Sequence, residues 1–144
     1  MKKIPINQEV IKSKLKEIRD DLMKLEDFKK IPLEEYKSGH NFAASEHYLR
    51  RALEAMLEIG THILSRLPGA KPHTYKDIPK LLGEHKVVSS EFAQGQLIKM
   101  AGYRNRLIHF YAEIDNEELY NIIQNDLPDL ERFCQYIVKY IEKI

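Results

Sequence analysis

The sequence predicts an all-α fold, an up-and-down bundle of four main helices and one short helix. Apolar residues recur at spacings of three and four through most of the chain. No segment alternates between apolar and polar residues as a half-buried strand does. The chain has 144 residues, which fits a single domain over 1–144 with enough apolar residues for a core.

The first helix is expected to start after Asn7, because an asparagine side chain can accept a hydrogen bond from the free N–H groups of a first helical turn. Pro32 disfavours helical backbone at Ile31, so this helix should end at about Phe28–Lys30. Its apolar stripe follows a 4-3-4-3 spacing and consists of Ile11, Leu15, Ile18, Leu22 and Leu25.

A second, long helix is expected to begin between Pro32 and Asn41. Pro68-Gly69 stops it, and the next residues up to Pro72 form a loop. Its apolar residues include Phe42, Leu49, Leu53, Met56, Leu57, Ile63, Leu64 and Leu67.

Two further helices are predicted from their starting signals. Thr74 with Asp77 has the spacing of a capping box and opens a short helix that ends near Leu82-Gly83. Ser89 or Ser90 caps the helix after it. That helix carries Phe92, Leu97, Ile98 and Met100.

The last predicted helix begins at a second capping box, formed by Asp115 and Glu118. Pro128 lies within this span, where a proline can kink a helix. The apolar stripe continues to the end of the chain through Leu119, Ile122, Ile123, Leu127, Leu130, Phe133, Ile137, Ile141 and Ile144.

Composition excludes several classes of protein. Cys134 is the single cysteine, so no intrachain disulfide can form, and it should be a small buried hydrophobe. No apolar run is long enough to span a membrane, and residues 1–5 lack the apolar core of a signal peptide. We therefore expect a cytoplasmic protein without a membrane partner.

Charge is distributed unevenly, although the formal net charge is only +1. Residues 92–112 contain no Asp or Glu, and residues 113–131 contain no Lys or Arg. If the two segments lie on different faces, the fold carries a charge dipole. For the acidic run, a solvated surface is the simpler interpretation.

The basic segment contains the most informative stretch of the chain, residues 103–111, with the sequence YRNRLIHFY. Arg104 and His109 are five residues apart, which is about 140° around a helix. They can converge if the arginine reaches around, if the helix loosens near its end, or if a second chain supplies one of them. Because the capping box at Asp115 follows closely, this helix should end soon after Tyr111.

These side chains suit the cleavage of RNA without a metal. Such cleavage needs a base to activate the 2′-hydroxyl and a cation to stabilise charge on the phosphate. His109 and Arg104 could fill these roles, Asn105 could position the histidine, and the flanking tyrosines could stack on bases. From spacing alone, polar surface groups are the more common explanation of such a pair.

His47, Arg51, Glu54 and Glu58 form a polar stripe on the second helix. The simpler interpretation is a solvent-facing surface with ion pairs. The alternative is that the stripe faces the motif and orients Arg104 through Glu54 or Glu58. His40 and His47 lack further ligands at a recognised metal spacing, and no glycine-rich phosphate loop is present, so we expect no metal or cofactor. The remaining histidines stand alone: His62, His73 and His85.

The stretch from Arg104 to Tyr111 resembles the Arg-x4-6-His signature of HEPN domains, in the form that marks HepT-like toxins. In this form Arg-Asn is followed by three residues, a histidine, one further residue and a tyrosine, which here are Arg104-Asn105, His109 and Tyr111. The lead-in Met100–Tyr103 is similar to that family too. The resemblance covers nearly the whole chain in order. It includes Tyr75–Ile78 with Leu81-Leu82, and Glu54–Gly60, where an aspartate is more usual than Glu58.

The resemblance implies a homodimer in which two motif copies meet across a cleft. It implies the toxin of a type VII toxin–antitoxin system, a metal-independent ribonuclease acting on tRNA or mRNA. Arg104 and His109 would be catalytic and Asn105 would assist. A cognate minimal nucleotidyltransferase antitoxin would transfer AMP to Tyr111. The residues expected to bind RNA or support the site are Lys99, Tyr103, Arg106, Arg51, Glu54 and Glu58.

Two alternatives stay open at this point. The same groups could hold a nucleotide or another anion without catalysis, or the bundle could serve as a partner for a nucleotidyltransferase. The chain could also be a purely structural helical protein.

Overall fold

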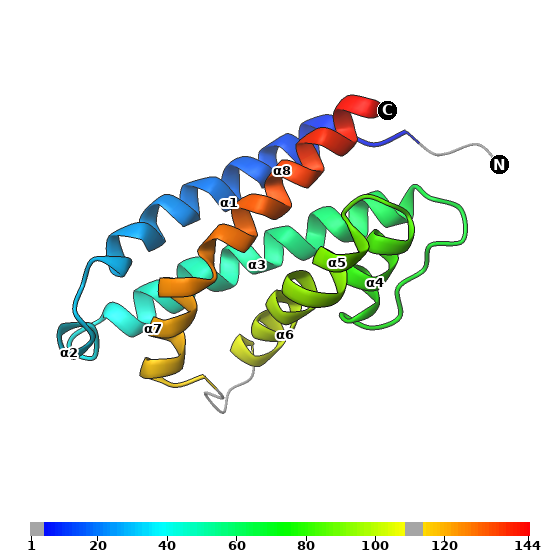
Figure 1. The fold of residues 1–144 in the computed structure, drawn as a ribbon. Coiled ribbons are helices and arrows are strands. Elements are labelled where there is room, and N and C mark those ends of the chain that lie inside the picture. The colour runs from blue at the N-terminus through cyan, green and yellow to red at the C-terminus, as the bar shows by residue number, and fades with distance from the viewer. Residues whose placement is uncertain (1–4, 109–113) are drawn as a thin grey trace.

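A computed structural model of the chain describes residues 5–108 and 114–144, and all regular structure in these ranges is helical. Helix α1 (Gln8–Lys29) packs along α3 (Asn41–Ser65), and α8 (Leu127–Lys143) contacts both, as Figure 1 shows. The all-α fold predicted from periodicity is confirmed. No helix in the described part of the chain is long and apolar enough to cross a membrane.

Helix α1 has the predicted boundaries. The Asn7 side chain accepts a hydrogen bond from the Val10 N–H at 3.2 Å, and the helix ends at Lys29. The helix buries the predicted stripe except for Leu22, which is partly buried against the core. Each leucine or isoleucine buried in this way contributes about 1.5–3 kcal/mol.

A short helix that the periodicity did not predict, α2 (Leu33–Tyr36), follows Pro32. It is too short to show a helical repeat, but it anchors the connection to α3. Tyr36 is fully buried, and its hydroxyl lies 2.6 Å from the Ser45 Oγ. Helix α7 (Asn116–Asn125) closes over this connection, where the Tyr120 hydroxyl donates to the Ile31 carbonyl at 2.7 Å.

Helix α3 ends at Ser65, shortly before the predicted stop at Pro68-Gly69. Helix α4 (Asp77–Glu84) begins later than predicted, at Asp77 itself. The Asp77 carboxylate accepts from the N–H groups of His73 and Thr74 at 2.8 and 3.1 Å. It therefore orders the turn before the helix, and these hydrogen bonds lower the pKa of Asp77.

The helix that carries the motif is a run of three segments: α5 (Ser90–Phe92), η1 (Ala93–Leu97) and α6 (Ile98–Leu107). Ser89 caps the run as predicted, since its Oγ accepts from the Phe92 N–H at 3.1 Å. The segment η1 is a π-helical turn, which the sequence did not predict. A π-turn shifts the register of the following residues relative to a straight α-helix.

The prediction of one continuous final helix is wrong. Helix α7 ends at Asn125, and α8 starts at Leu127 with Pro128 in its first turn, where no intrahelical N–H is needed. Figure 1 shows the two axes at an angle to each other. The start was predicted correctly, because the Asp115 Oδ1 accepts from the Glu118 N–H at 2.9 Å.

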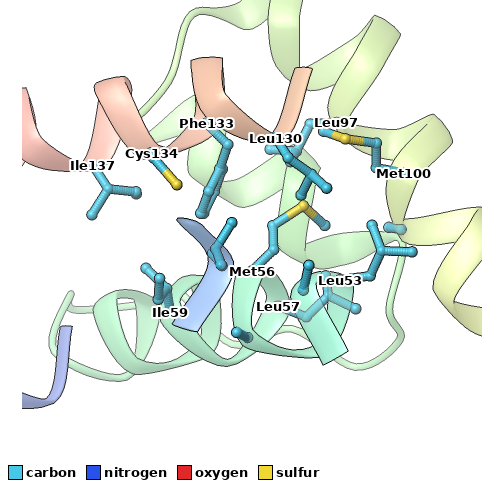
Figure 2. Packing of buried hydrophobic residues seen from close by; sticks show 14 of the residues in the cluster. Leu53, Met56, Leu57, Ile59, Leu97, Met100, Leu130, Phe133, Cys134 and Ile137 are labelled. Carbon is cyan, nitrogen blue, oxygen red and sulfur yellow. The ribbon is translucent and has the colours of Figure 1, made fainter. Parts of the chain in front are cut away.

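Helices α1 and α7 contribute to the hydrophobic core, and Figure 2 shows the part of it between α3, the η1–α6 segment and α8. Cys134 points into it and is fully buried, as predicted. The labelled core residues in Figure 2 are Leu53, Met56, Leu57, Ile59, Leu97, Met100, Leu130, Phe133, Cys134 and Ile137. This packing fixes α6 on α3 and so determines where the motif begins.

Candidate active site

The first part of the motif lies on the last turn and a half of α6, which ends at Leu107. The helix therefore ends earlier than expected from the sequence. Arg104 and Asn105 are both half-buried at this end. His109 and Tyr111, the predicted base and the predicted modification site, lie outside the described residues.

Arg104 lines a cavity of about 620 Å³. Its Nε is buried and has no hydrogen-bond partner within residues 5–108 and 114–144. Buried polar atoms are nearly always paired, so an exception needs an explanation, such as a catalytic role or a bound water or ion. The α3 residues that line this cavity with Arg104 include Glu54 and Glu58.

The four residues of the polar stripe predicted on α3 lie in two different environments. Glu54 and Glu58 line the same cavity as Arg104, and that they orient Arg104 stays a prediction. The Glu58 Oε2 also lies 2.8 Å from the Lys14 Nζ on α1, so this carboxylate is already paired.

The remaining members of the stripe lie away from Arg104. The Arg51 Nε lies 3.5 Å from the Asp21 Oδ2, and its Nη2 lies 3.7 Å from the Glu17 Oε1, both on α1. His47 is exposed, with its ring edge against Tyr48. Arg51 thus connects α3 to α1, as the ion-pair interpretation expected.

Asp21 is the most deeply buried carboxylate among the described residues, with 1% of its surface exposed. Burial raises its pKa, while the nearby Arg51 opposes that rise. The positive charge of Arg51 thus favours the ionised form of Asp21, which burial disfavours. We assign this pair to the α1–α3 interface rather than to catalysis.

Arg106 forms a bidentate ion pair with Glu118. Its Nη1 and Nη2 donate to Oε2 and Oε1 at 2.6 and 2.7 Å. The pair joins the end of α6 to the start of α7, on either side of the segment that carries His109 and Tyr111. The acidic run thus contacts the basic segment at this pair.

Lys99 and Tyr103 lie toward Asp126, at the junction of α7 and α8. The Tyr103 hydroxyl donates to the Asp126 Oδ2 at 2.8 Å, and the Lys99 Nζ lies 3.7 Å from the same oxygen. Only 9% of Tyr103 is exposed. The expectation that Tyr103 stacks on a base does not fit this placement, because its ring is packed in the protein.

The structure adds three residues that sequence reasoning did not connect with the motif. His62, Arg66 and Tyr75 line the same cavity as Arg104. They come from the end of α3 and from the segment before α4. No motif links them, and only their position in the fold brings them together. Within the described ranges, no group of three His, Cys, Asp or Glu side chains could hold a metal ion.

The described residues thus form a helical bundle that places Arg104-Asn105 at the end of α6 beside a cavity. Comparison with known proteins identifies the family of this bundle. The family model described as "Ribonuclease HepT-like" matches residues 14–137, most of the chain. The chain therefore belongs to the HepT-like ribonuclease family.

Two curated relatives are similar in sequence. The tRNA nuclease HepT of Aphanizomenon flos-aquae is 29% identical over 133 residues, which is 92% of this chain and 90% of that protein. The mRNA nuclease HepT of Shewanella oneidensis is 29% identical over 89 residues, 62% of this chain and 66% of that protein. The two relatives are thus named for different RNA substrates.

Solved structures support the fold. The protein YutE of Bacillus subtilis, described as a cytosolic protein of unknown function, superimposes with a TM-score of 0.82 at 24% identity, covering 96% of this chain and 92% of that one. A tri-AMPylated HEPN toxin of Shewanella oneidensis in complex with MNT antitoxin gives 0.80 at 23% identity, covering 90% and 97%.

Proposed function

We propose that this protein is the ribonuclease toxin of a type VII toxin–antitoxin system and cleaves tRNA or mRNA in the cytoplasm without a metal. The observation that carries the proposal is Arg104, which lines the cavity of about 620 Å³ at the end of the motif helix and whose buried Nε has no hydrogen-bond partner in the described part of the chain. A guanidinium held in this way is a ready partner for a phosphate group.

In the proposed reaction, His109 takes the proton from a ribose 2′-hydroxyl as that oxygen attacks the adjacent phosphorus. The bond from phosphorus to the 5′ oxygen breaks, and a protonated histidine returns a proton to that oxygen. Arg104 stabilises the negative charge that grows on the phosphate, and Asn105 helps to orient the reacting groups. The products are a 2′,3′-cyclic phosphate and a free 5′-hydroxyl.

We propose further that the site is completed in a homodimer. Helix α6 ends at Leu107, so Arg104 is fixed by the bundle while His109 comes after the helix. On a continuing helix the two would point about 140° apart. Two motif copies facing each other would let Arg104 of one chain act with His109 of the other.

Regulation is proposed to act through Tyr111. A cognate minimal nucleotidyltransferase antitoxin would transfer AMP to its hydroxyl, as suggested by the AMPylated relative bound to MNT antitoxin. Another similar structure is a toxin–antitoxin complex with AMP-PNP. Each AMP would place a bulky anionic group two residues from His109, where it would obstruct the site and repel RNA phosphates.

Cleavage of tRNA and mRNA by the purified protein in EDTA tests this function. We expect cleavage by the wild type, and a loss of at least about 100-fold for His109→Ala, since general base catalysis contributes about that much. Arg50→Ala serves as a matched control, because Arg50 pairs with Glu46 on α3 and does not line the cavity. RNA binding without turnover by the wild type would favour the non-catalytic alternative.

A further inference from the structure

The cavity beside Arg104 is long, and α3 forms its floor. The lining residues run from Glu54 on α3 to Arg66, which directly follows the end of that helix. A helix rises 1.5 Å per residue, so this floor is about 18 Å long. One wall comes from α1, including Lys14, and the other from Tyr75 and Ile78. We call this space the α3 groove.

Arg66 also lines the α3 groove, and its side chain shares one feature with that of Arg104. Its Nε is also buried with no hydrogen-bond partner in the described part of the chain. Its Nη1 donates to the Ser65 Oγ at 2.6 Å, which holds the guanidinium in place. Arg66 and Arg104 both line this one groove, and two guanidinium groups on one groove suit a ligand with more than one anionic group.

Between these arginines the groove is lined by both polar and apolar side chains, and its ionisable groups carry little excess charge. Lys14 neutralises Glu58 at 2.8 Å, leaving Glu54 against Arg66 and Arg104. The His62 Nε2 accepts the Asn7 N–H at 3.2 Å, and burial together with Arg66 lowers the His62 pKa. The imidazole is therefore neutral at neutral pH, and the lining charges sum to +1.

An aromatic side chain stands in the wall of the groove. Tyr75 is half-buried, so part of its ring is accessible from the cavity. Exposed aromatic rings beside cationic groups are typical of surfaces that bind single-stranded nucleic acid, where each base can stack on a ring. Stacked nucleotides are spaced about 3.4 Å apart, so a groove of about 18 Å exceeds the needs of a single nucleotide.

We propose that the α3 groove binds the RNA strand next to the cleaved phosphate, with Arg66 contacting a second phosphate and Tyr75 stacking on a base. This inference rests on the proposed function, because it takes RNA as the ligand. The inference adds to the proposed function that the C-terminal end of α3, away from the motif, is part of the substrate site.

Binding of a fluorescent single-stranded RNA oligonucleotide tests the proposal, measured by anisotropy over a range of salt concentrations. The full-length His109→Ala protein is the background, so that the RNA is not consumed. Adding Arg66→Ala should weaken binding about tenfold or more, the loss expected for a charged hydrogen bond. The slope of log K against log salt should fall by about 0.7, the value for one phosphate contact on a single strand.

Tyr75→Ala should also weaken binding, by about fivefold or more, but leave the salt slope unchanged, because stacking releases no counterions. Arg66→Lys should recover the salt slope, since it keeps the charge. Arg50→Ala on the same helix should change neither quantity. A purely structural role for Arg66 would alter the melting temperature without altering the slope.

The groove proposal is overturned if Arg66→Ala and Tyr75→Ala bind RNA as tightly as the background, or if Arg66→Ala converts a dimer to a monomer by light scattering. The second result would mean that another copy of the chain occupies the groove. Failure of the proposed function looks different: the wild type would not cleave RNA, while the two variants would still show the binding losses.

Discussion

At the scale of single residues, two arginines of the candidate site differ from the other arginines in how their guanidinium groups are paired. Arg19, Arg50, Arg51 and Arg106 each pair with a carboxylate. The Nε atoms of Arg104 and Arg66 are instead buried with no hydrogen-bond partner in the described ranges, and both residues line one cavity. The sequence predicted Arg104 from its motif, but nothing in the sequence distinguished Arg66 from other arginines.

Cys134 gives a prediction at the same scale. It is fully buried in the core, and burial raises the pKa of its thiol to about 12. The thiolate is the reactive form, so Cys134 should not react with a thiol reagent at pH 8 in the folded protein. Denaturation should make one thiol per chain reactive. Rapid labelling without denaturant would show that the α8 face opens.

At the scale of elements, Gly60 sets the distance between α3 and α4. A Cβ at this position would lie 2.7 Å from the Ile78 Cγ2 and 3.1 Å from the Leu82 Cδ1. The Ile78 methyl is attached to a branched Cβ, so it cannot swing away easily. Gly60→Ala should therefore destabilise the fold by about 1–3 kcal/mol in urea unfolding, despite the better helix propensity of alanine.

Gly102→Ala is the matched control for this substitution. A Cβ at Gly102 would meet no heavy atom within 4 Å, and the residue lies inside α6. Its replacement should leave stability unchanged or raise it by up to about 1 kcal/mol. Equal effects of the two substitutions would contradict the close approach of α3 and α4.

The Arg106–Glu118 pair gives a second prediction about elements. It joins α6 to α7 with two hydrogen bonds at 2.6 and 2.7 Å, and about 37% of each side chain is exposed. A double-mutant cycle with Arg106→Gln and Glu118→Gln should give a coupling energy of about 0.5–1 kcal/mol. The more exposed pair of Lys16 with Asp20 should give a smaller coupling energy.

The same pair links element structure to the site. It bridges the segment that carries His109 and Tyr111, so Glu118→Gln should lower RNA cleavage although Glu118 is not proposed to touch the substrate. If Arg106→Gln and Glu118→Gln were each as stable as the wild type and cleaved RNA at the wild-type rate, the Arg106–Glu118 pair would have no role in the site.

Most helices could be predicted from the sequence, but two junctions between helical segments could not. Helix starts at Asn7, Ser89 and Asp115 were predicted because each has a side chain that caps its own helix locally. The π-turn η1 and the break at Asp126 were not predicted. Apolar spacing continues through both, and the backbone there depends on packing against other helices.

At the scale of the whole molecule, the candidate site was only partly predictable. Arg104 and Asn105 form one local motif, so residue spacing and family resemblance were enough to select them. The α3 groove combines α1, α3, the segment before α4 and the end of α6. Residues such as Arg66 and Tyr75 become neighbours of Arg104 only after the bundle has formed.

In the proposed homodimer, Arg104 of one chain acts with His109 of the other. Complementation tests it most directly: Arg104→Ala and His109→Ala chains carrying different tags are co-expressed, and the mixed dimer is purified through both tags. Each homodimer should be inactive, whereas the mixed dimer retains one intact site and should cleave RNA at about half the wild-type rate. A mixed dimer as inactive as both homodimers, beside an active wild type, would contradict the claim.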